Sequence, residues 1–385
     1  MKLSEIFFVS AVLITTSLAH AVPSPTPIKV DVQNVDSCGS SQFNFVDLGN
    51  LSNTQYPLPA FANSINNKGI TVGFATANEN HGHAYKHSDQ VGIEDLAPYI
   101  QESKLIDSFA VDINDNNHIV GGMWLSQFPY QRQFYFDGHS VEYFEDDGDQ
   151  HEHRTVAINN LDKTVGYRFD NPGVTMFVRQ NGTVYYLPRL YENGSHFAYD
   201  MSDNDIIVGS VSTPPVYAGR AFRFSLNHNN YELLPDLDNS SGRESIAMAI
   251  SSNGKIIVGS FRTRPSPSPE GYTSKPVFWK TNPRTGALTV SGIIPPYLIN
   301  RGVARSVNNG GIMIGGVDDA FYIHKEFIYN SNTRQYYDLI SKVINFPSGY
   351  TDFTPLKIND NCQIVGYVAD TQHGIHSFRL DPVRY

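Results

Sequence analysis

One short phrase recurs along the chain: an aliphatic residue, one or two Asn, Asp or Ser residues, a turn, and an ending in Val-Gly or Ile-Gly. The copies span residues 65–73, 113–121, 158–166, 201–209, 250–259, 307–315 and 358–366. Their closing glycines lie 43 to 56 residues apart, and internal repeats of this period are typical of propellers and other repeat arrays. The repeats therefore constrain the fold more than any other feature of the chain.

Each repeat contains signals for four short strands, which we letter a to d. A run of small residues, such as residues 109–111, precedes the phrase and predicts strand a, and the Val-Gly ending predicts strand b. Between them, Asn, Asp and Gly supply the positive φ angles that a tight hairpin needs. An aromatic pair, as in residues 134–136, predicts strand c, and an aliphatic run, as in residues 93–96, predicts strand d. Four strands per repeat are typical of a propeller blade.

The two ends of the chain complement each other. Residues 43–48 have the character of strand d with no other strand before them, whereas the last repeat stops after strand c, at residues 378–380. We therefore predict an all-β fold: a single seven-bladed β-propeller of four-stranded blades over residues 41–385. The N-terminal strand would complete the last blade, which closes the ring and removes exposed sheet edges.

The two cysteines fit this closure. Cys38 lies just before the N-terminal strand, and Cys362 lies in the a–b turn of the last repeat. The alternative is two unrelated free thiols, but two cysteines in an exported chain are more often paired. A bridge over so long a loop would stabilise the fold by at most about 5 kcal/mol. We predict a Cys38–Cys362 disulfide, reached by folding the N-terminal segment over the rim of the blade.

The first 21 residues resemble a signal peptide. Lys2 precedes an apolar run over residues 6–18, which is too short to span a membrane, and residues 19–21 (Ala-His-Ala) fit a cleavage site. Residues 22–40 then read as a Pro/Ser-rich linker. We predict cleavage near Ala21 and a secreted or periplasmic protein without a transmembrane segment.

Composition excludes one class of partner. The chain has 28 Lys and Arg against 38 Asp and Glu, a net charge of -10, and no basic stripe that would bind phosphates. Nucleic acid is therefore not expected as a partner, and we expect an extracellular or periplasmic protein or glycan and a monomeric state. Most of the aromatic residues fall at repeated strand positions, which favours a role in the core.

The hairpin phrase followed by the triplet His83-Ala84-Tyr85 resembles the HAF-repeat family of predicted extracellular bacterial proteins, named for a His-Ala-Phe triplet. The resemblance covers residues 60–380, and the triplet returns in altered form at residues 220–222 and 376–378. It implies an exported propeller. It implies no activity or catalytic residue, because no shared activity is established for that family.

The connections between strands b and c, and between d and the next a, lie on the face where propellers usually bind ligands. The most unusual connection spans residues 142–154. Its acidic residues offer hard oxygens for Ca²⁺, and its histidines, with two from a loop on the same face, offer ligands for a borderline metal. The candidate ligands are Asp146, Asp147, Asp149, His151, His153, His81 and His83. The alternative is a solvated acidic loop, since no known calcium motif is complete.

Strand a carries charges at positions where other repeats have Ser64, Ala157, Ala249 or Ser306. These charged residues are Asp112, Asp200 and Lys357, with Arg305 one position earlier than the rest. They are candidates for a binding site at the channel mouth. The alternative is that they pair with one another or with water.

Motifs of hydrolases, metalloproteases and phosphate-binding enzymes are missing from the sequence. The leading hypothesis is an exported binding module that contacts a protein or glycan through loops of one face. The alternative is a secreted or periplasmic polysaccharide hydrolase or lyase, with a metal or acid/base site in the acidic, His-containing loop. The sequence leaves open whether the protein is an enzyme.

Overall fold

The computed structural model describes most of the chain after the N-terminal region. The described residues are Cys38, 42–52, 59–78, 81–100, 105–126, 131–144, 151–212, 219–238, 244–263, 273–282, 284–285, 287–293, 299–319, 323–372 and 374–383. The predicted signal peptide and nearly all of the predicted linker lie outside these residues, as do Asp146, Asp147 and Asp149.

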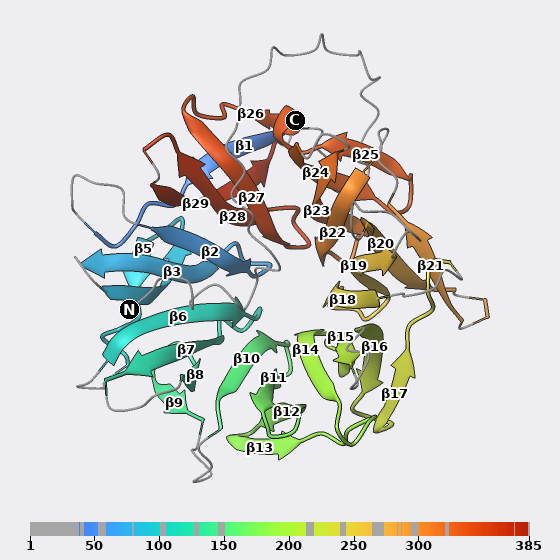
Figure 1. Ribbon diagram of the computed structural model, residues 1–385. Coiled ribbons are helices and arrows are strands. Elements are labelled where there is room, and N and C mark those ends of the chain that lie inside the picture. The colour runs from blue at the N-terminus through green and yellow to red at the C-terminus, as the bar shows by residue number, and fades with distance from the viewer. Residues whose placement is uncertain are drawn as a thin grey trace.

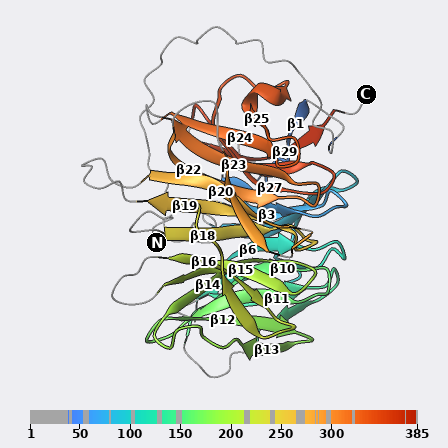
Figure 2. The same cartoon turned by 90° about the vertical axis from the view of Figure 1, so that its right-hand side faces the viewer.

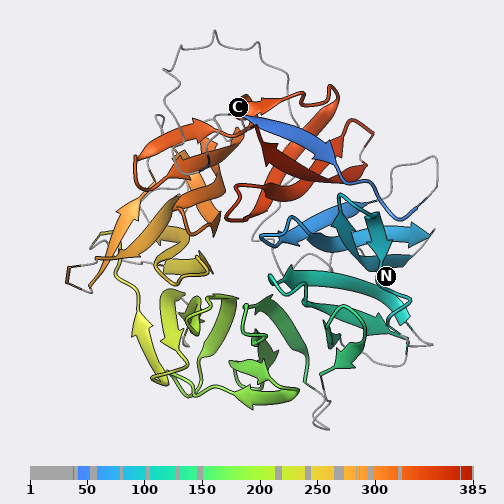
Figure 3. The ribbon, with the colours of Figure 1, turned by 180° about the vertical axis from the view of Figure 1, so that it is seen from behind.

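Strands dominate the described residues and form four-stranded antiparallel groups around a common centre (Figures 1 and 3). Figure 2 views the same groups from the side. We name each group a unit, after its innermost strand. Within a unit the strands follow one another outward from the centre, so they correspond to strands a to d of the sequence repeat. The chain is therefore all-β, as predicted.

The strand bounds follow the repeats. The β2 unit contains β2 (Ala60–Ile65), β3 (Thr71–Asn78), β4 (His81–Ser88) and β5 (Gly92–Asp95). The β6 unit contains β6 (Leu105–Ile113), β7 (Ile119–Leu125), β8 (Arg132–Phe136) and β9 (Val141–Tyr143). The β10 unit contains β10 (His153–Ile158), β11 (Thr164–Phe169), β12 (Val174–Gln180) and β13 (Thr183–Tyr186). The β14 unit contains β14 (Ser195–Met201), β15 (Ile206–Ser212), β16 (Arg220–Ser225) and β17 (Asn230–Leu233).

The second half of the chain continues the pattern. The β18 unit contains β18 (Glu244–Ile250), β19 (Ile256–Thr263), β20 (Thr273–Thr281) and β21 (Leu288–Gly292). The β22 unit contains β22 (Ile299–Val307), β23 (Ile312–Asp319), β24 (His324–Asn330) and β25 (Gln335–Asp338), and a short 3-10 helix, η2 (Ile340–Lys342), follows it. The β27 unit contains β27 (Tyr350–Ile358), β28 (Ile364–Asp370) and β29 (Ile375–Pro382).

The outer strand of the β27 unit comes from the other end of the chain. Strand β1 (Phe43–Asp47) pairs antiparallel with β29, from Phe43 opposite Pro382 to Asp47 opposite Phe378. It occupies the strand d position that the sequence assigned to residues 43–48. A two-residue strand that the sequence did not predict, β26 (Val343–Ile344), pairs parallel with the outer edge of β1.

The disulfide between Cys38 and Cys362 is confirmed, with 5.7 Å between the two Cα atoms and 324 residues between them in sequence. Cys362 has a positive φ of 63°, in a turn where other units have Asn, Asp or Gly. Its side chain is 1% exposed and packs among apolar residues of β1, β23 and β28. The bridge therefore ties the segment before β1 to the turn beside the centre of the molecule.

Every strand a contains a bulge, and the bulge explains the glycine that ends each phrase. In the β14 unit the register shifts between Ala198 and Asp200, so Tyr199 is an extra residue opposite β15. A Cβ on Gly209 would overlap the carbonyl oxygen of Phe197 and touch the ring of Phe222. The same overlap with a strand a carbonyl occurs at the glycines of the other units. Only glycine leaves room for the bulge on one side and the strand c aromatic ring on the other.

We predict that Gly209→Ala destabilises the protein by about 2 kcal/mol or more, because the added methyl group must displace backbone rather than a flexible side chain. Thermal or denaturant unfolding measures the loss. The matched control is Gly219→Ala in the same unit, where the added Cβ would meet its nearest atoms at 3.8 Å. Equal stability of the two variants would contradict this explanation of the repeat glycine.

Among the described residues, no helix is long and apolar enough to cross a membrane.

Candidate functional site

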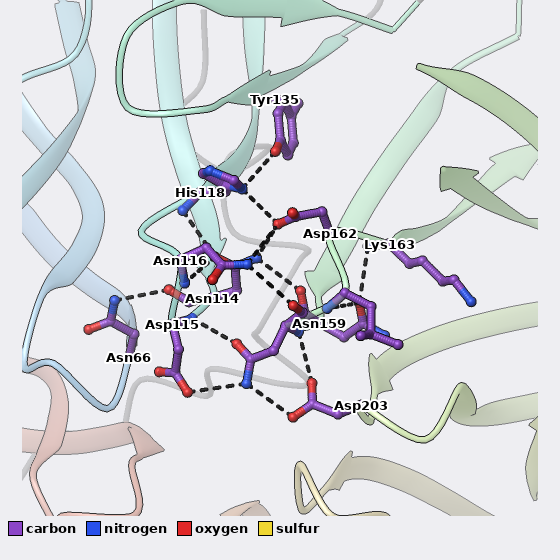
Figure 4. A network of polar contacts seen from close by, with 12 residues as sticks. Asn66, Asn114, Asp115, Asn116, His118, Tyr135, Asn159, Asp162, Lys163 and Asp203 are labelled. Atoms are coloured by element: carbon purple, nitrogen blue, oxygen red, sulfur yellow. Dashed lines mark hydrogen bonds and ion pairs between the residues drawn. The ribbon is translucent and has the colours of Figure 1, made fainter. Parts of the chain in front are cut away.

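The first polar residue of an a–b turn bonds to two units at once. Asn66 Oδ1 accepts hydrogen bonds from the N–H groups of Lys68 (3.1 Å) and Ile70 (3.0 Å), which fixes its own turn. Its Nδ2 donates to the carbonyl oxygen of Asn114 in the next unit, at 2.9 Å. Asn114 donates in the same way to the carbonyl oxygen of Asn159, also at 2.9 Å (Figure 4). A carboxamide suits this position because the turn needs an acceptor and the neighbouring carbonyl needs a donor.

We name these side chains the Asn bridges. Further bridges run from Asn159 to the carbonyl oxygen of Ser202 (3.2 Å), from Asn308 to that of Asn359 (3.2 Å), and from Asn359 to that of Asn66 (2.8 Å). The last bridge joins the β27 unit to the β2 unit. Ser202 and Ser251 take the place of Asn in two turns. In the described residues neither hydroxyl bonds to the next unit's carbonyl, which a serine side chain is too short to reach.

The next residue of each turn forms a second ring, which we name the Asn/Asp belt. It consists of Asn67, Asp115, Asn160, Asp203, Ser252, Asn309 and Asp360. The N–H of Asn67 donates to Asp115 Oδ1, and the N–H of Asp115 donates to Asn160 Oδ1, both at 2.8 Å. Asn160 Nδ2 donates to Oδ2 of Asp115 (3.1 Å) and of Asp203 (3.0 Å). Carboxamides thus alternate with carboxylates, because a carboxylate only accepts and each needs a donor beside it.

A third contact between units involves His118. Its Nδ1 lies 2.6 Å from Asp162 Oδ1 in the next unit and 2.8 Å from the hydroxyl of Tyr135 in its own unit (Figure 4). Burial raises the pKa of Tyr135 to about 12. Both partners meet the same ring nitrogen, so the imidazole cannot pass a proton from one to the other. The corresponding contact in the next pair of units is an ion pair between Lys163 and Asp205, at 2.7 Å. These contacts hold units together and do not form a catalytic relay.

We predict that Asn114→Asp destabilises the protein by roughly 1–3 kcal/mol, because the new carboxylate keeps the turn but cannot donate to the Asn159 carbonyl. Ser202→Asn is the reciprocal change. It should add a missing Asn bridge and leave stability unchanged or raised. Denaturant unfolding compares the three proteins, and a neutral Asn114→Asp variant would show that the bridges contribute nothing.

A cavity of about 70 Å³ lies inside the Asn/Asp belt. Its lining includes Asp112, Asp200 and Lys357, three of the charged strand a residues that the sequence singled out. The Lys357 ammonium nitrogen is 3.7 Å from Asp200 Oδ1, and Asp112 and Asp200 are each 6% exposed. The structure therefore brings these three residues together. The volume is suited to a few water molecules or one small ion rather than to a sugar ring.

The two carboxylates also link units. Asp112 accepts hydrogen bonds from the Ser64 hydroxyl (2.5 Å) of the preceding unit and from the N–H of Ile158 (2.9 Å) in the next one. Asp200 accepts from the N–H of Ile250 in its next unit, at 2.9 Å. Ser306 makes the equivalent bond to the N–H of Ile358, at 3.3 Å. Small-residue positions on strand a thus become acceptors for the neighbouring backbone.

Burial and neighbouring charges shift the pKa values of Asp200 and Lys357 in this cavity. Burial raises the pKa of Asp200 above its ordinary value, although Lys357 acts in the opposite direction. For Lys357, burial alone would lower the pKa, but the carboxylates of Asp200 and Asp112 outweigh it and hold the pKa above its ordinary value. Lys357 therefore stays an ammonium ion at neutral pH.

Arg305 does not join this group. It is the extra residue of the bulge between Ala304 and Ser306, and this displaces it from the position that Asp112, Asp200 and Lys357 share. Its Nη1 instead donates to Glu326 Oε2 at 2.5 Å. His324 lies between Glu326 Oε1 (2.8 Å) and Asp318 Oδ1 (2.7 Å). Hydrogen bonds to Asp318 and Glu326 raise the pKa of His324 to about 9.

This pKa gives a testable pH dependence. The folded pKa of His324 lies above its ordinary value of 6.5, so its stabilising effect is complete below about pH 6.5 and is lost as pH rises through about 9. We expect His324→Gln to be less stable than wild type at pH 6 and to approach it near pH 10. Exposed His228→Gln is the control and should keep the wild-type pH profile. An unchanged profile in His324→Gln would contradict the assignment.

Of the remaining histidine candidates, His83 has a hydrogen-bond partner, whereas Nδ1 of His81 has none among the described residues. His83 Nδ1 lies 2.9 Å from Asp95 Oδ2 at the end of strand d, and His81 Nδ1 lies 3.9 Å from Asp107. The first residue of the triplet behaves similarly elsewhere, since Arg220 pairs with Asp236 at 3.2 Å. The triplet residue therefore ties strand c to the segment at the end of strand d. This role was not predicted from the sequence.

Within the described part of the chain, the proposed histidine ligands do not form a metal site. His153 Nε2 lies 2.9 Å from the Tyr186 hydroxyl, and its Nδ1 lies 3.1 Å from the carbonyl oxygen of His151. Among the described residues, no group of three His, Cys, Asp or Glu side chains has the geometry to hold a metal ion. The three acidic residues of that loop lie outside the described residues, so a calcium site there stays a prediction.

One further ring of residues was not predicted from the sequence. The extra residue of each bulge is partly exposed in every unit, although strand a is the innermost strand and the residue just before each bulge is buried. We name this set the bulge ring. It consists of Asn63, Val111, Val156, Tyr199, Met248, Arg305 and Leu356. No local sequence signal marks it, apart from its fixed distance from the phrase.

No family model matches the sequence, and no curated protein is significantly similar to it. Solved structures are similar at low identity. An oligogalacturonate lyase from Vibrio parahaemolyticus is 12% identical, with a TM-score of 0.54 over 88% of this chain and 97% of that one. The β-propeller domain of the Trilobed protease from Pyrococcus furiosus is 11% identical, with a TM-score of 0.52 over 88% and 96% of the two chains.

The chain has the β-propeller fold. A structure of oligogalacturonate lyase in complex with manganese is also similar, at 11% identity and a TM-score of 0.55 over 89% of this chain and 97% of that one. At such identities the likeness shows the fold alone and transfers no active-site residue.

Proposed function

We propose that the protein is an exported, seven-bladed, closed β-propeller that binds a protein or glycan at the end of its central channel opposite the Asn/Asp belt. The units described above are the proposed blades. Each blade has the same inner strand, bulge and turn, and the Asn359 bridge to Asn66 matches the bridge from Asn66 to Asn114 in direction and length. Strand β1 supplies the outer strand of the last blade, and the disulfide fastens it there.

Export is supported by the disulfide, because such bonds persist in oxidising compartments. The amino-terminal 21 residues have the pattern of a cleavable signal peptide, and residues 22–40 that of a linker. We propose a secreted or periplasmic location, a monomeric state and membership of the HAF-repeat family on these sequence features.

The observation that carries the binding role is a difference between repeated positions. At the belt end, the blades use Asn, Asp or Ser again and again, and these side chains bond to one another. In the bulge ring, equivalent positions hold Asn, Val, Tyr, Met, Arg and Leu, and all are partly exposed. Positions that must hold the fold together repeat, whereas positions that vary on a rigid scaffold are free to recognise a ligand.

Geometry also sets the direction of approach. The Asn bridges and the belt occupy the a–b turns, so the polar groups at that end are already engaged by neighbouring blades. Arg305, Tyr199 and Met248 each lie one residue farther from the belt than the strand a position of Asp112, Asp200 and Lys357, and together offer a charge, a ring and an apolar surface. We propose that the ligand enters from the end opposite the belt.

The test compares ligand capture by wild type and by Tyr199→Ala and Arg305→Ala variants, using a glycan array and pull-down from the organism's own surface extract. We expect each variant to capture at least tenfold less ligand than wild type. The matched control is Leu161→Ala, because Leu161 is 55% exposed on an a–b turn at the opposite end. Equal loss in the control, or no loss in either channel variant, would overturn the proposed site.

The alternative function is a polysaccharide hydrolase or lyase assisted by a metal, and the observation that favours it is the similar fold of an oligogalacturonate lyase in complex with manganese. Its assay is release of reducing or unsaturated ends from extracellular polysaccharides, with and without added Ca²⁺. Metal-dependent product release that disappears when Asp146, Asp147 and Asp149 are changed to Asn would favour the enzyme over the binding module.

A further inference from the structure

The cavity inside the Asn/Asp belt contains an unequal set of charges. Its lining includes the carboxylates of Asp112, Asp115, Asp200, Asp203 and Asp360 but only one ammonium group, that of Lys357. Asp112 and Asp200 are each 6% exposed. Burying carboxylates without a cation is costly, since a charge removed from water needs a compensating partner. The cavity therefore requires a cation, and in this chain the cation is covalently attached.

The ammonium group is held loosely enough to be replaced. Its nearest oxygen is Asp200 Oδ1, at 3.7 Å, which is longer than a strong charge-assisted hydrogen bond. An ammonium group has three donors, and the side chain of Lys357 is 29% exposed. The cavity of about 70 Å³ beside it has room for a small ion.

The repeats show which substitutions the backbone tolerates here. Ala157 and Ala249 occupy the position equivalent to Lys357, and Ser306 occupies that of Asp200. Strand a has the same bulge in all of these units. Lys357→Ala and Asp200→Ser therefore place at each site a residue that the same scaffold already accommodates.

We infer that the axial cavity is a binding site for a small ammonium-type cation, one that donates N–H hydrogen bonds, and that the Lys357 ammonium group occupies it as a tethered counter-ion. Removing the amine would leave Asp112 and Asp200 facing each other across an emptied cavity. Ammonium or methylammonium from solution would then bind between the two carboxylates. The same charges exclude anionic ligands from this end of the channel, which goes beyond the binding role proposed for the other end.

The experiment measures the melting temperature of Lys357→Ala against the concentration of ammonium chloride and methylammonium chloride. We expect the variant to melt several degrees below wild type and to recover part of that loss in a saturable manner. Sodium chloride at equal ionic strength and tetramethylammonium chloride, which is too large for the cavity, should restore less. Wild type should not respond to ammonium beyond its response to sodium.

The matched control is the double variant Asp200→Ser with Lys357→Ala, which lacks one carboxylate as well as the amine. It should show no specific ammonium effect. A Lys357→Ala protein that responds equally to all four salts, or not at all, would overturn the inference.

A second measurement keeps Lys357 and therefore does not depend on whether the alanine variant folds. NMR titration of the lysine ammonium groups should show one group whose pKa lies above the ordinary lysine value and falls in Asp200→Ser. An unchanged lysine pKa in Asp200→Ser would show that Lys357 does not neutralise this carboxylate, and would equally overturn the inference.

Discussion

The hydrogen bonds of the asparagine that recurs in the a–b turns determine much of this architecture. Its oxygen closes the a–b turn of its own unit, and its nitrogen reaches the carbonyl of the next unit, as Asn114 does with Asn159. Other polar residues cannot make both sets of bonds. An aspartate side chain cannot donate a hydrogen bond to the carbonyl oxygen of the next unit, and a serine side chain is too short to reach it. Turn geometry and the spacing between neighbouring sheets are therefore coupled in one residue. The bulge and its facing glycine then place strand a at the distance this bond requires.

The Asn/Asp belt has an odd number of positions, and this prevents strict alternation of hydrogen-bond donors and acceptors around the ring. Donors and acceptors can alternate around a ring only if the number of positions is even. In this belt the alternation fails at Ser252, where the N–H of Asp203 donates to the Ser252 carbonyl oxygen (2.9 Å) and not to a side chain. The N–H of Asn253 then donates to Asn309 Oδ1 (2.8 Å), which resumes the pattern. The two missing Asn bridges lie in the same part of the ring.

The sequence predicted what is local and repeated. Strand order, the turns with positive φ, the outer position of residues 43–48 and the Cys38–Cys362 pair all follow from the period of the phrase and from its turn residues. The sequence placed Arg305 one position before the other charged residues, but it did not show that Arg305 is the extra residue of a bulge, because a bulge is a property of two paired strands. The partners of His83 and His324 were also missed. They come from strands whose relative register no single repeat reveals.

The strand that completes the last sheet, β1, comes from near the start of the chain. Phe45 bonds to Asn345, 300 positions later, and Cys38 is joined to a residue 324 positions away. As the polypeptide emerges from the ribosome or a translocon, β1 must wait without its sheet while every other unit is synthesised. The fold can therefore be completed only after β29 has been synthesised, and a product truncated before residue 362 would lack the partners of both β1 and Cys38.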